Sequence, residues 1–448
     1  MSVRTFRRGL IAAAVVALGV RVAYILIFRH DVLPGGDSFT YHLGSRLLVE
    51  GHGFIEPQPL INGIAEQSAS HPPLYLLYLA IPSSVGLDGP VAQMLWSSLV
   101  GVGTVVLVGF TGREVAGPRA GLVAAGLAAV YPNLWIFDGF ILSETMAMFT
   151  AILCVYLAYR YLRTPTPWRA AALGLACGVA ALARAELVLL VPLLVVPCVL
   201  ITRTIDLRKK LQWLLVAGLA ALIPIGPWVT FNLIRFDRPV FLSTGLEPTL
   251  VGANCDRTYY TDLIGYFSPD CTESVFEAPR NGGPDQSERN VRLGRVAREY
   301  IWDNKTRVPL VVLARWGRVT GLYRPDQQLQ LDEHIEGRER GTAVAALLSF
   351  YLVAALAITG AVILRRRRVK VFPLIVPCAI VLFAVAVALG SNRYRASAEP
   401  ALVVLAAVAI NAGLSAFERR RSRAPLTETE PEVNEKTVVG AAAPVDGA

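Results

Sequence analysis

The sequence predicts an all-α polytopic membrane protein. Of its 448 residues, 54% are hydrophobic and only 17% are charged, whereas soluble globular proteins average about 25% charged residues. Many apolar runs reach the roughly 20 residues that a helix needs to cross a bilayer. The formal net charge of +9 is carried by short Arg and Lys clusters between these runs. Such clusters indicate membrane orientation, and they predict no nucleic-acid partner.

Ten apolar runs are expected to span the membrane. The first, residues 9–28, follows Arg4, Arg7 and Arg8 and has features of a signal peptide. No small-residue cleavage pattern follows it and Arg21 interrupts it, so we expect a retained span. The other nine runs are residues 89–110, 119–137, 141–161, 169–184, 186–202, 211–231, 342–364, 371–389 and 399–417.

The basic clusters all agree with one orientation. If the first span starts in the cytoplasm, every cluster falls on the cytoplasmic face, as the positive-inside rule requires. The clusters are Arg113 with Arg119, Arg160 with Arg163 and Arg169, Arg203 with residues 208–210, residues 365–368 with Lys370, and residues 419–423. We therefore expect a plasma-membrane protein with both termini in the cytoplasm and its active surface outside the cell.

This threading divides the chain into four regions. The last is rich in Pro, Glu, Thr and Ala, and we expect it to be a disordered cytoplasmic tail. The regions are an N-terminal transmembrane module, residues 1–231, with a first outer loop, residues 29–73; an extracytoplasmic segment between spans 7 and 8, residues 232–341; C-terminal transmembrane helices, residues 342–417; and the tail, residues 418–448.

The extracytoplasmic segment carries a predicted disulfide. Cys255 and Cys271 lie in its polar part, whereas the other four cysteines lie in apolar runs. Disulfides persist outside the cytoplasm, and closing this loop would contribute on the order of 3 kcal/mol; the alternative is two unrelated thiols. No cysteine spacing indicates a metal site. Later in the segment, residues 287–323 are predicted to form a helix with a solvated face.

The first outer loop is expected to hold interfacial helices. A short amphipathic helix begins at Asp37 and ends near Gly51, with apolar residues at i, i+4 spacing. Such a helix lies on a membrane surface. Asp37 alone is explained by helix capping, which is compatible with a second role. His71 then precedes residues 74–85, an apolar stretch of about 12 residues that is too short to span and is predicted to be interfacial or re-entrant.

Other polar residues gather at outer helix ends. Arg21 in the first span is expected either to snorkel to the surface or to contact the first outer loop. Arginines on the outer face oppose the positive-inside trend, and an anionic lipid head group would explain them. The further candidates are Asp138, Ser143, Glu144, Arg184, Glu186, Arg393, Tyr394, Arg395 and Glu399.

Together these pieces resemble the GT-C superfamily of polyprenyl-phosphate-sugar-dependent glycosyltransferases. The resemblance is to bacterial relatives of protein O-mannosyltransferases and of the lipid A aminoarabinose transferase. It extends over most of the chain up to about residue 417, and the order and shared outer placement of the pieces carry it. The pieces are residues 37–42 (DSFTYH), 51–54 (GHGF), 71–75 (HPPLY), 142–144 (LSE), 182–186 (LARAE), 393–395 (RYR) and 399–400 (EP).

The resemblance implies an enzyme of cell-envelope or cell-wall biogenesis. It would move a hexosyl or pentosyl group from a polyprenyl-phosphate donor to an acceptor hydroxyl on a glycan, lipid or protein, with inversion of the anomeric centre. Asp37 would be the catalytic base, and Glu144 or Asp138 the second acidic group. The implied substrate-binding residues are Tyr41, His42, His71, Asp138, Glu144, Arg184, Arg393, Tyr394 and Arg395.

The cofactor is left open, with a divalent cation as the candidate. Relatives often carry two adjacent acidic residues in the first loop, whereas Asp37 is followed by Ser38. Without the resemblance, the same chemistry needs only a carboxylate to deprotonate the acceptor and cations to hold the departing phosphate. The alternative functions are a flippase for lipid-linked oligosaccharides and an envelope scaffold. A transporter places broken helices and polar sites near the midplane, and neither that pattern nor a repeat is visible here.

Overall fold

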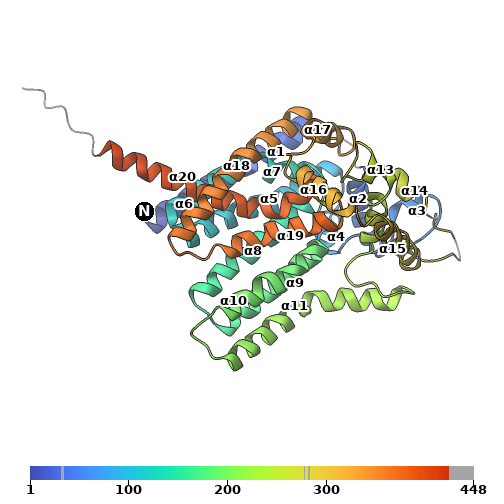
Figure 1. Cartoon of the computed structure of the whole chain (residues 1–448), viewed down its shortest axis with the longest axis horizontal. Helices are drawn as coiled ribbons and strands as arrows, with labels where there is room; N and C mark the ends of the chain where they lie inside the picture. The colour runs from blue at the N-terminus through green and yellow to red at the C-terminus, as the bar shows by residue number, and fades with distance from the viewer. Residues whose placement is uncertain (32–34, 277, 281–282, 423–448) are drawn as a thin grey trace, which may run out of the picture. The chain divides into compact units, whose positions relative to one another are not determined.

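The described part of the chain is helical. The computed structural model describes residues 1–31, 35–276, 278–280 and 283–422, and within them the only β pairing is an isolated antiparallel bridge between Ile55 and Gln67 (Figure 1). The all-α class is therefore confirmed. Residues 1–411 form one compact unit, and the rest of the chain is a separate unit. The predicted disordered tail lies outside the described residues from residue 423 onward.

Each predicted span corresponds to a helix or a broken helix. The long helices are α1 (Val3–Tyr24), α5 (Pro90–Ala116), α6 (Pro118–Val130), α8 (Glu144–Arg163), α9 (Pro167–Ala183), α11 (Leu207–Arg235), α18 (Arg340–Arg366), α19 (Phe372–Val387) and α20 (Glu399–Arg421). Between α9 and α11 the chain forms a short 3-10 turn, a π turn and α10 (Val196–Leu200).

Length and composition alone support fewer spans than ten. Within the described residues, six helices are long and apolar enough to cross a membrane, or seven if α6 and the segment Pro132–Gly139, bent by 73°, form one span. The helices α9 and α19 and the segment Ala185–Leu200 are apolar but shorter. The protein is thus a multi-pass membrane protein, and the count of ten stays a prediction.

Proline and glycine shape these helices. The helices α5, α6, α7 (Pro132–Trp135) and α9 each begin at a proline, whose fixed φ and missing N–H suit the first helical turn. On α9, a Cβ at Gly174 would lie 2.0 Å from the carbonyl oxygen of Ala217 on α11. The two backbones approach as closely as membrane helices do through small residues.

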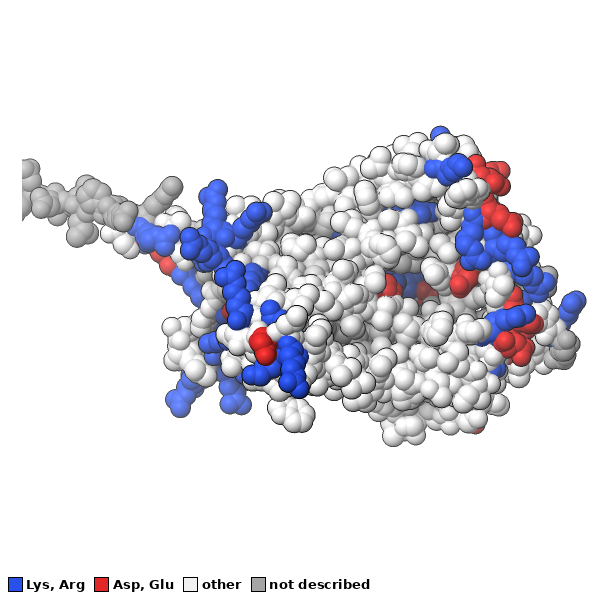
Figure 2. All heavy atoms as spheres, turned by 60° about the horizontal axis from the view of Figure 1, so that its bottom comes forward, with Lys and Arg blue, Asp and Glu red and all other residues white. Residues whose placement is uncertain are grey.

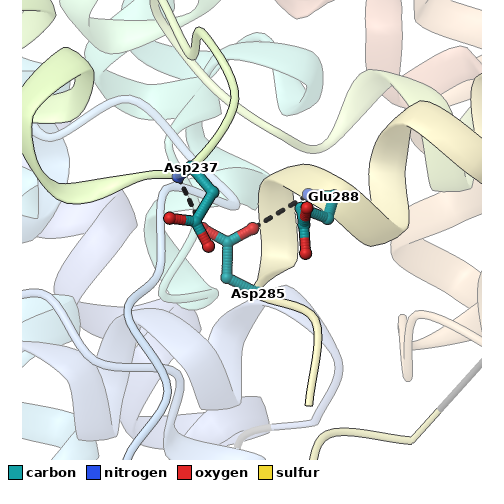
Figure 3. A group of neighbouring side chains, drawn as sticks. All are labelled: Asp237, Asp285 and Glu288. Atoms are coloured by element: carbon teal, nitrogen blue, oxygen red, sulfur yellow. Dashed lines mark hydrogen bonds between the residues drawn. The ribbon is translucent and has the colours of Figure 1, made fainter. Parts of the chain in front are cut away.

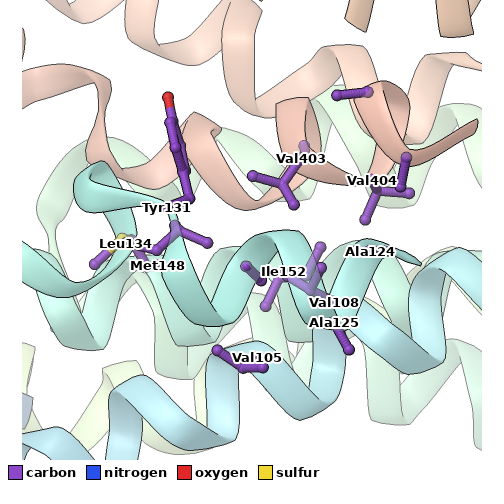
Figure 4. Close-up of a cluster of buried hydrophobic side chains, with 14 of the residues drawn as sticks. Val105, Val108, Ala124, Ala125, Tyr131, Leu134, Met148, Ile152, Val403 and Val404 are labelled. Carbon is purple, nitrogen blue, oxygen red and sulfur yellow. The ribbon is translucent and has the colours of Figure 1, made fainter. Parts of the chain in front are cut away.

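The main apolar core joins α1, α5, α6, α8 and α20. Figure 4 shows Val105 and Val108 of α5, Ile152 of α8, and Val403 and Val404 of α20 within this core, and all five side chains are buried. Because protein interiors tolerate little change in volume, this core fixes the helix ends that carry polar residues.

The outer elements are short helices. The pair Cys255 and Cys271 forms a disulfide with a Cα–Cα distance of 6.3 Å. The stretch 287–323, predicted to be one solvated helix, forms two helices, α15 (Gln286–Asp303) and α16 (Val308–Val319). On α15, Arg289 is buried rather than solvated. The elements are α2 (Asp37–Val49), α3 (Pro57–Ile61), α4 (Leu74–Ser83), α12 (Leu246–Ala253), α13 (Asp256–Tyr260), α14 (Pro269–Glu273), α15 (Gln286–Asp303), α16 (Val308–Val319) and α17 (Pro325–His334).

The basic loops share one end of the helical unit. Figure 2 shows Lys and Arg gathered there almost alone, whereas acidic and basic residues mix at the other end. Contacts tie these loops together: the Arg163 guanidinium lies 3.0 Å from Glu114, and the Tyr159 hydroxyl donates a hydrogen bond to the carbonyl of Lys370. One end of the unit therefore carries the predicted cytoplasmic loops.

This arrangement predicts which loops face the cytoplasm. Reporter fusions ending after Arg203 and after Arg365 are expected to give a cytoplasmic signal, because basic loops resist translocation. A fusion ending after Ser274, in the extracytoplasmic segment, is expected to report the outside. A cytoplasmic signal at Ser274 would invert the proposed orientation.

Candidate functional site

A cavity of about 1,320 Å³ opens among the outer elements. Its lining includes apolar residues, such as Leu189 and Phe383, and polar residues, such as Glu56, Gln58 and Gln286. The cavity thus joins a surface suited to a lipid chain to one suited to a hydrated molecule. Of the candidates from the sequence, it is lined by Asp37, Tyr41, His71, Ser143, Arg184, Glu186, Arg393 and Tyr394.

Asp37 is the first residue of α2, and its side chain does not cap that helix. The cap position belongs to Gly36, which has φ 54°, a backbone conformation that favours glycine. The Asp37 carboxylate instead accepts a hydrogen bond from Nη2 of Arg393 at 2.6 Å, and His71 Nε2 lies 3.6 Å from its other oxygen. Capping therefore does not explain Asp37.

The arginine and the histidine keep Asp37 ionised. Burial alone would raise the pKa of the Asp37 carboxyl. The charge of Arg393 and the neighbouring His71 ring together lower that pKa by more than burial raises it, so the pKa lies well below its ordinary value. The side chain is still 39% exposed. An anionic carboxylate thus faces the cavity over the physiological pH range.

Glu144 holds two arginines at the cavity. Its Oε1 accepts hydrogen bonds from Nε of Arg393 and from Nη1 of Arg184, the latter at 2.6 Å, and its side chain is fully buried. Arg184 also donates from Nε to Glu186 at 2.5 Å, and its guanidinium lies over the Tyr394 ring. A buried acid thus orients two cations from distant parts of the chain.

Both guanidinium groups keep a donor for a ligand. Nη1 of Arg393 and Nη2 of Arg184 make no hydrogen bond to the described residues, and neither atom is among the buried polar atoms without a partner. These two N–H groups are therefore accessible, and both residues line the cavity, where arginine donors suit an anionic oxygen such as that of a phosphate.

Aromatic packing positions His71. Its ring stacks on Tyr41 of α2 with 4.7 Å between the centroids, and Tyr41 packs edge-on against Tyr75 of α4. Because Tyr41 and Tyr75 are buried, the stack holds the imidazole beside Asp37.

Four predicted site residues are not among those that line the cavity: Glu144, which lies behind the two arginines, and His42, Asp138 and Arg395. His42 hydrogen-bonds to Gln93 at 2.9 Å. Asp138 is buried in an ion pair with Arg21 at 2.5 Å, so Arg21 neither snorkels nor contacts the first outer loop. Arg395 is paired with Glu399 and donates to the carbonyl of Val319. Each satisfies a polar group inside the helical unit, where an unpaired charge is costly.

Sequence inspection missed Glu336 and Arg29, which also line the cavity. Glu336 pairs with Arg338 at 2.5 Å, and Arg29 donates to the carbonyls of Gly139 and Gly337. In the sequence, the signal for Glu336 was the charged run just before span 8. These contacts bring the end of the extracytoplasmic segment back to the cavity.

The carboxylates close enough to share an ion lie elsewhere. Among the described residues, one such group is Asp237, Asp285 and Glu288, which do not line the cavity. Figure 3 shows Asp285 accepting hydrogen bonds from the backbone N–H groups of Asp237 and Glu288. Asp285 is the N-cap of α15, so capping accounts for this cluster.

Comparisons with known proteins agree with this fold. A family model described as dolichyl-phosphate-mannose-protein mannosyltransferase matches residues 70–231. The oligosaccharyltransferase of Archaeoglobus fulgidus, solved with zinc and sulfate, shares 15% identity at a TM-score of 0.55 over 92% of this chain and 50% of its own. The same enzyme in complex with an inhibitory peptide and a dolichol-phosphate shares 14% identity at a TM-score of 0.54. That match covers 93% of this chain and 51% of the enzyme.

The chain spans about half the length of that oligosaccharyltransferase. ArnT from Cupriavidus metallidurans bound to undecaprenyl phosphate gives 14% identity over 93% of this chain and 80% of its own, but a TM-score of 0.44 is too low to add support. No curated protein sequence matches the chain. The family model and the shared fold confirm the predicted resemblance to the GT-C superfamily.

The ion pairs of Glu144 predict a stability test. Glu144→Ala removes the shared partner of Arg184 and Arg393, and we expect it to destabilise the protein by about 3–5 kcal/mol, as the loss of one partner of a buried pair does. The matched control is Asp88→Ala, because the Asp88 side chain is 40% exposed in its pair with Arg46 and its loss should cost less than about 1 kcal/mol. Thermal unfolding in detergent measures both, and equal losses would show that Glu144 does not organise the site.

Proposed function

We propose that the protein is a membrane glycosyltransferase that uses a polyprenyl-phosphate sugar donor. It transfers a hexosyl or pentosyl group to an acceptor hydroxyl at the extracytoplasmic face, in cell-envelope glycan or glycoconjugate synthesis. One observation carries the proposal: Asp37, Arg184 and Arg393 line the same cavity, and each arginine keeps an N–H group without a partner among the described residues. A carboxylate beside an anion site is the minimum that this transfer requires.

The cavity lining fits the two halves of the donor. Leu189 and Phe383 line it, and Phe383 is also exposed on the outer side of α19. A polyprenyl chain can therefore extend from the bilayer along these apolar residues while its phosphate meets the arginines. The polar lining at Glu56 and Gln286 is left for a hydrated acceptor.

The chemistry follows from these positions. Asp37 accepts the proton of the acceptor hydroxyl as that oxygen forms a bond to the anomeric carbon. The bond between the anomeric carbon and the phosphate oxygen breaks, and the polyprenyl phosphate leaves with the electron pair. Arg184 and Arg393 stabilise the charge that develops on the leaving group. A single displacement inverts the anomeric centre.

Donor binding would also tune the base. Arg393 lowers the pKa of Asp37 in the free protein, which makes the carboxylate a weak base. A donor phosphate attracts the same guanidinium, so it weakens the hold of Arg393 on Asp37 and raises the pKa of Asp37 toward its ordinary value. The base thus strengthens only when the donor is in place.

The Asp37 and Glu144 carboxylates do not fit a divalent cation. Asp37 already faces Arg393 and His71, and Glu144 already accepts from two arginines. Hard cations need several free oxygen ligands, and these carboxylates are neutralised by side-chain cations. In this chain the arginines supply the positive charge that the leaving group needs.

The Asp37 substitution tests the base directly. We expect Asp37→Asn to lower sugar transfer from a purified polyprenyl-phosphate sugar by about 100-fold or more, because an amide cannot accept the proton. Asp37→Glu should keep part of the activity. The matched control is Asp88→Asn, since Asp88 is 40% exposed and paired with Arg46 at 3.0 Å, but lies outside the cavity. A wild-type rate for Asp37→Asn would reject Asp37 as the base.

A second substitution tests the anion site. Arg393→Ala is expected to raise the KM for the donor by about 10-fold or more, because it removes a charged hydrogen bond to the phosphate, with a smaller change in the KM for the acceptor. Arg46→Ala serves as the control, because Arg46 forms the corresponding exposed pair with Asp88. An unchanged donor KM would show that Arg393 serves only to hold Asp37 and Glu144.

A further inference from the structure

The helix α16 has an apolar face that no described residue covers. Leu310, Leu313 and Trp316 lie on one side of it, and Leu313 is 60% exposed. Leu322, just after the helix, is 77% exposed. An exposed apolar patch of this kind marks an interaction surface in a folded protein.

The opposite face of α16 is buried and holds two arginines. Arg315 donates to the carbonyls of Ala386 at 2.8 Å and of Ala253 at 2.8 Å. Arg318 donates to the carbonyl of Ile264 at 2.7 Å. These contacts satisfy backbone carbonyls at the ends of α12 and α19 and in the turn after α13, where the chain lacks helical hydrogen-bond partners.

The end of α16 packs against two membrane helices. Trp316 donates from its indole to the carbonyl of Leu382 on α19, and Gly321 accepts a hydrogen bond from the Tyr351 hydroxyl on α18 at 2.5 Å. Tyr351 lies well inside α18, which begins at Arg340, and the intervening turns rise about 16 Å at 1.5 Å per residue. The contact therefore lies within the apolar part of α18.

The apolar face of α16 continues onto those helices. Leu382 and Phe383 of α19 are exposed, and so are Leu348 and Leu352 of α18. Helix α18 is long and apolar enough to cross a membrane, and α19 is a shorter apolar helix, so we expect their exposed apolar faces to meet lipid. The apolar face of α16 lies beside these faces, so we expect it to meet lipid as well.

The start of α16 carries groups typical of a membrane interface. The Lys305 ammonium lies 4.5 Å from the ring centroid of Trp302, and the Arg307 guanidinium lies 4.7 Å from that of Tyr260. Trp302 and Tyr260 are both exposed. Aromatic rings with adjacent cations sit at the head-group level of a bilayer.

We propose that α16 is embedded in the bilayer, with lipid acyl chains on Leu310 and Leu313 and lipid phosphates near Lys305 and Arg307. The extracytoplasmic segment, expected from its sequence to be solvated, is then anchored in the membrane. The anchor contacts the turn before α20, because Arg395 donates to the carbonyl of Val319 at the end of α16. Arg395 lies in the turn Asn392–Ala398, which also carries Arg393.

A fluorescent label at position 313 tests the proposal. Leu313→Cys and the control Glu299→Cys, an exposed polar position on α15, are each labelled with bimane in a Cys378→Ala background, since the other free cysteines are buried. Both proteins are reconstituted into vesicles of phosphatidylethanolamine and phosphatidylglycerol. The vesicles also contain lipids that carry a nitroxide on the acyl chain, close to the head group.

Embedding predicts opposite behaviour at the two positions. Bimane at 313 should lose about half of its fluorescence or more to the nitroxide lipids, as expected for a helix buried at the head-group and acyl boundary, and iodide in the water should quench it little. Bimane at 299 should respond to iodide and not to the lipids. Equal iodide quenching at both positions would overturn the proposal. The proposal would also be overturned if bimane at 313 were protected from iodide only at high protein concentration and were not quenched by the nitroxide lipids. In that case a second copy of the chain would cover this face.

Discussion

The candidate site depends on one guanidinium. Arg393 contacts Asp37 through Nη2 and Glu144 through Nε, so it links the first outer loop, the start of α8 and the turn before α20. An unpaired carboxylate near the membrane would raise the free energy of the folded protein, and so would an unpaired Arg393 guanidinium. The loop that carries Asp37 and the turn that carries Arg393 therefore help to hold each other in place. The cation that assembles the site is also the one placed to bind an anion.

Several buried ion pairs behind the cavity make this placement rigid. The pair of Arg21 and Asp138 ties α1 to the bend before α8, and the pair of Arg395 and Glu399 fixes the first turn of α20. Neither pair reaches the cavity, and both satisfy charges within apolar surroundings, where a lone charge is expensive. Their contribution to function is positional, because they hold the backbone from which Glu144 and Arg393 extend. The further contact between Arg395 and Val319 connects the same turn to α16.

The sequence predicted the helical class and the GT-C resemblance, because apolar run length and short motifs are local properties. It also singled out Asp37, His71 and Arg393, which the structure brings together at the cavity. It could not separate the two arginines of the Arg393-Tyr394-Arg395 motif, one of which faces the cavity while the other is buried, since adjacent residues of a turn point in different directions. Asp138 and Glu144 lie in one outer turn, and only their partners distinguish them. The capping interpretation of Asp37 failed for a similar reason: Gly36 takes the cap position, which depends on backbone torsions. Glu336 and Arg29 were missed because only tertiary folding brings them to the cavity.

The central claim is that the guanidinium groups of Arg184 and Arg393 hold the donor phosphate beside Asp37. An experimental structure of the protein in a lipid nanodisc with a bound polyprenyl phosphate measures this directly. We expect phosphate oxygens within hydrogen-bonding distance of Nη1 of Arg393 and Nη2 of Arg184, with the lipid chain leaving along Leu189 and Phe383. A phosphate bound outside this cavity, with Arg393 still fully engaged by Asp37 and Glu144, would contradict the proposed role of the arginines.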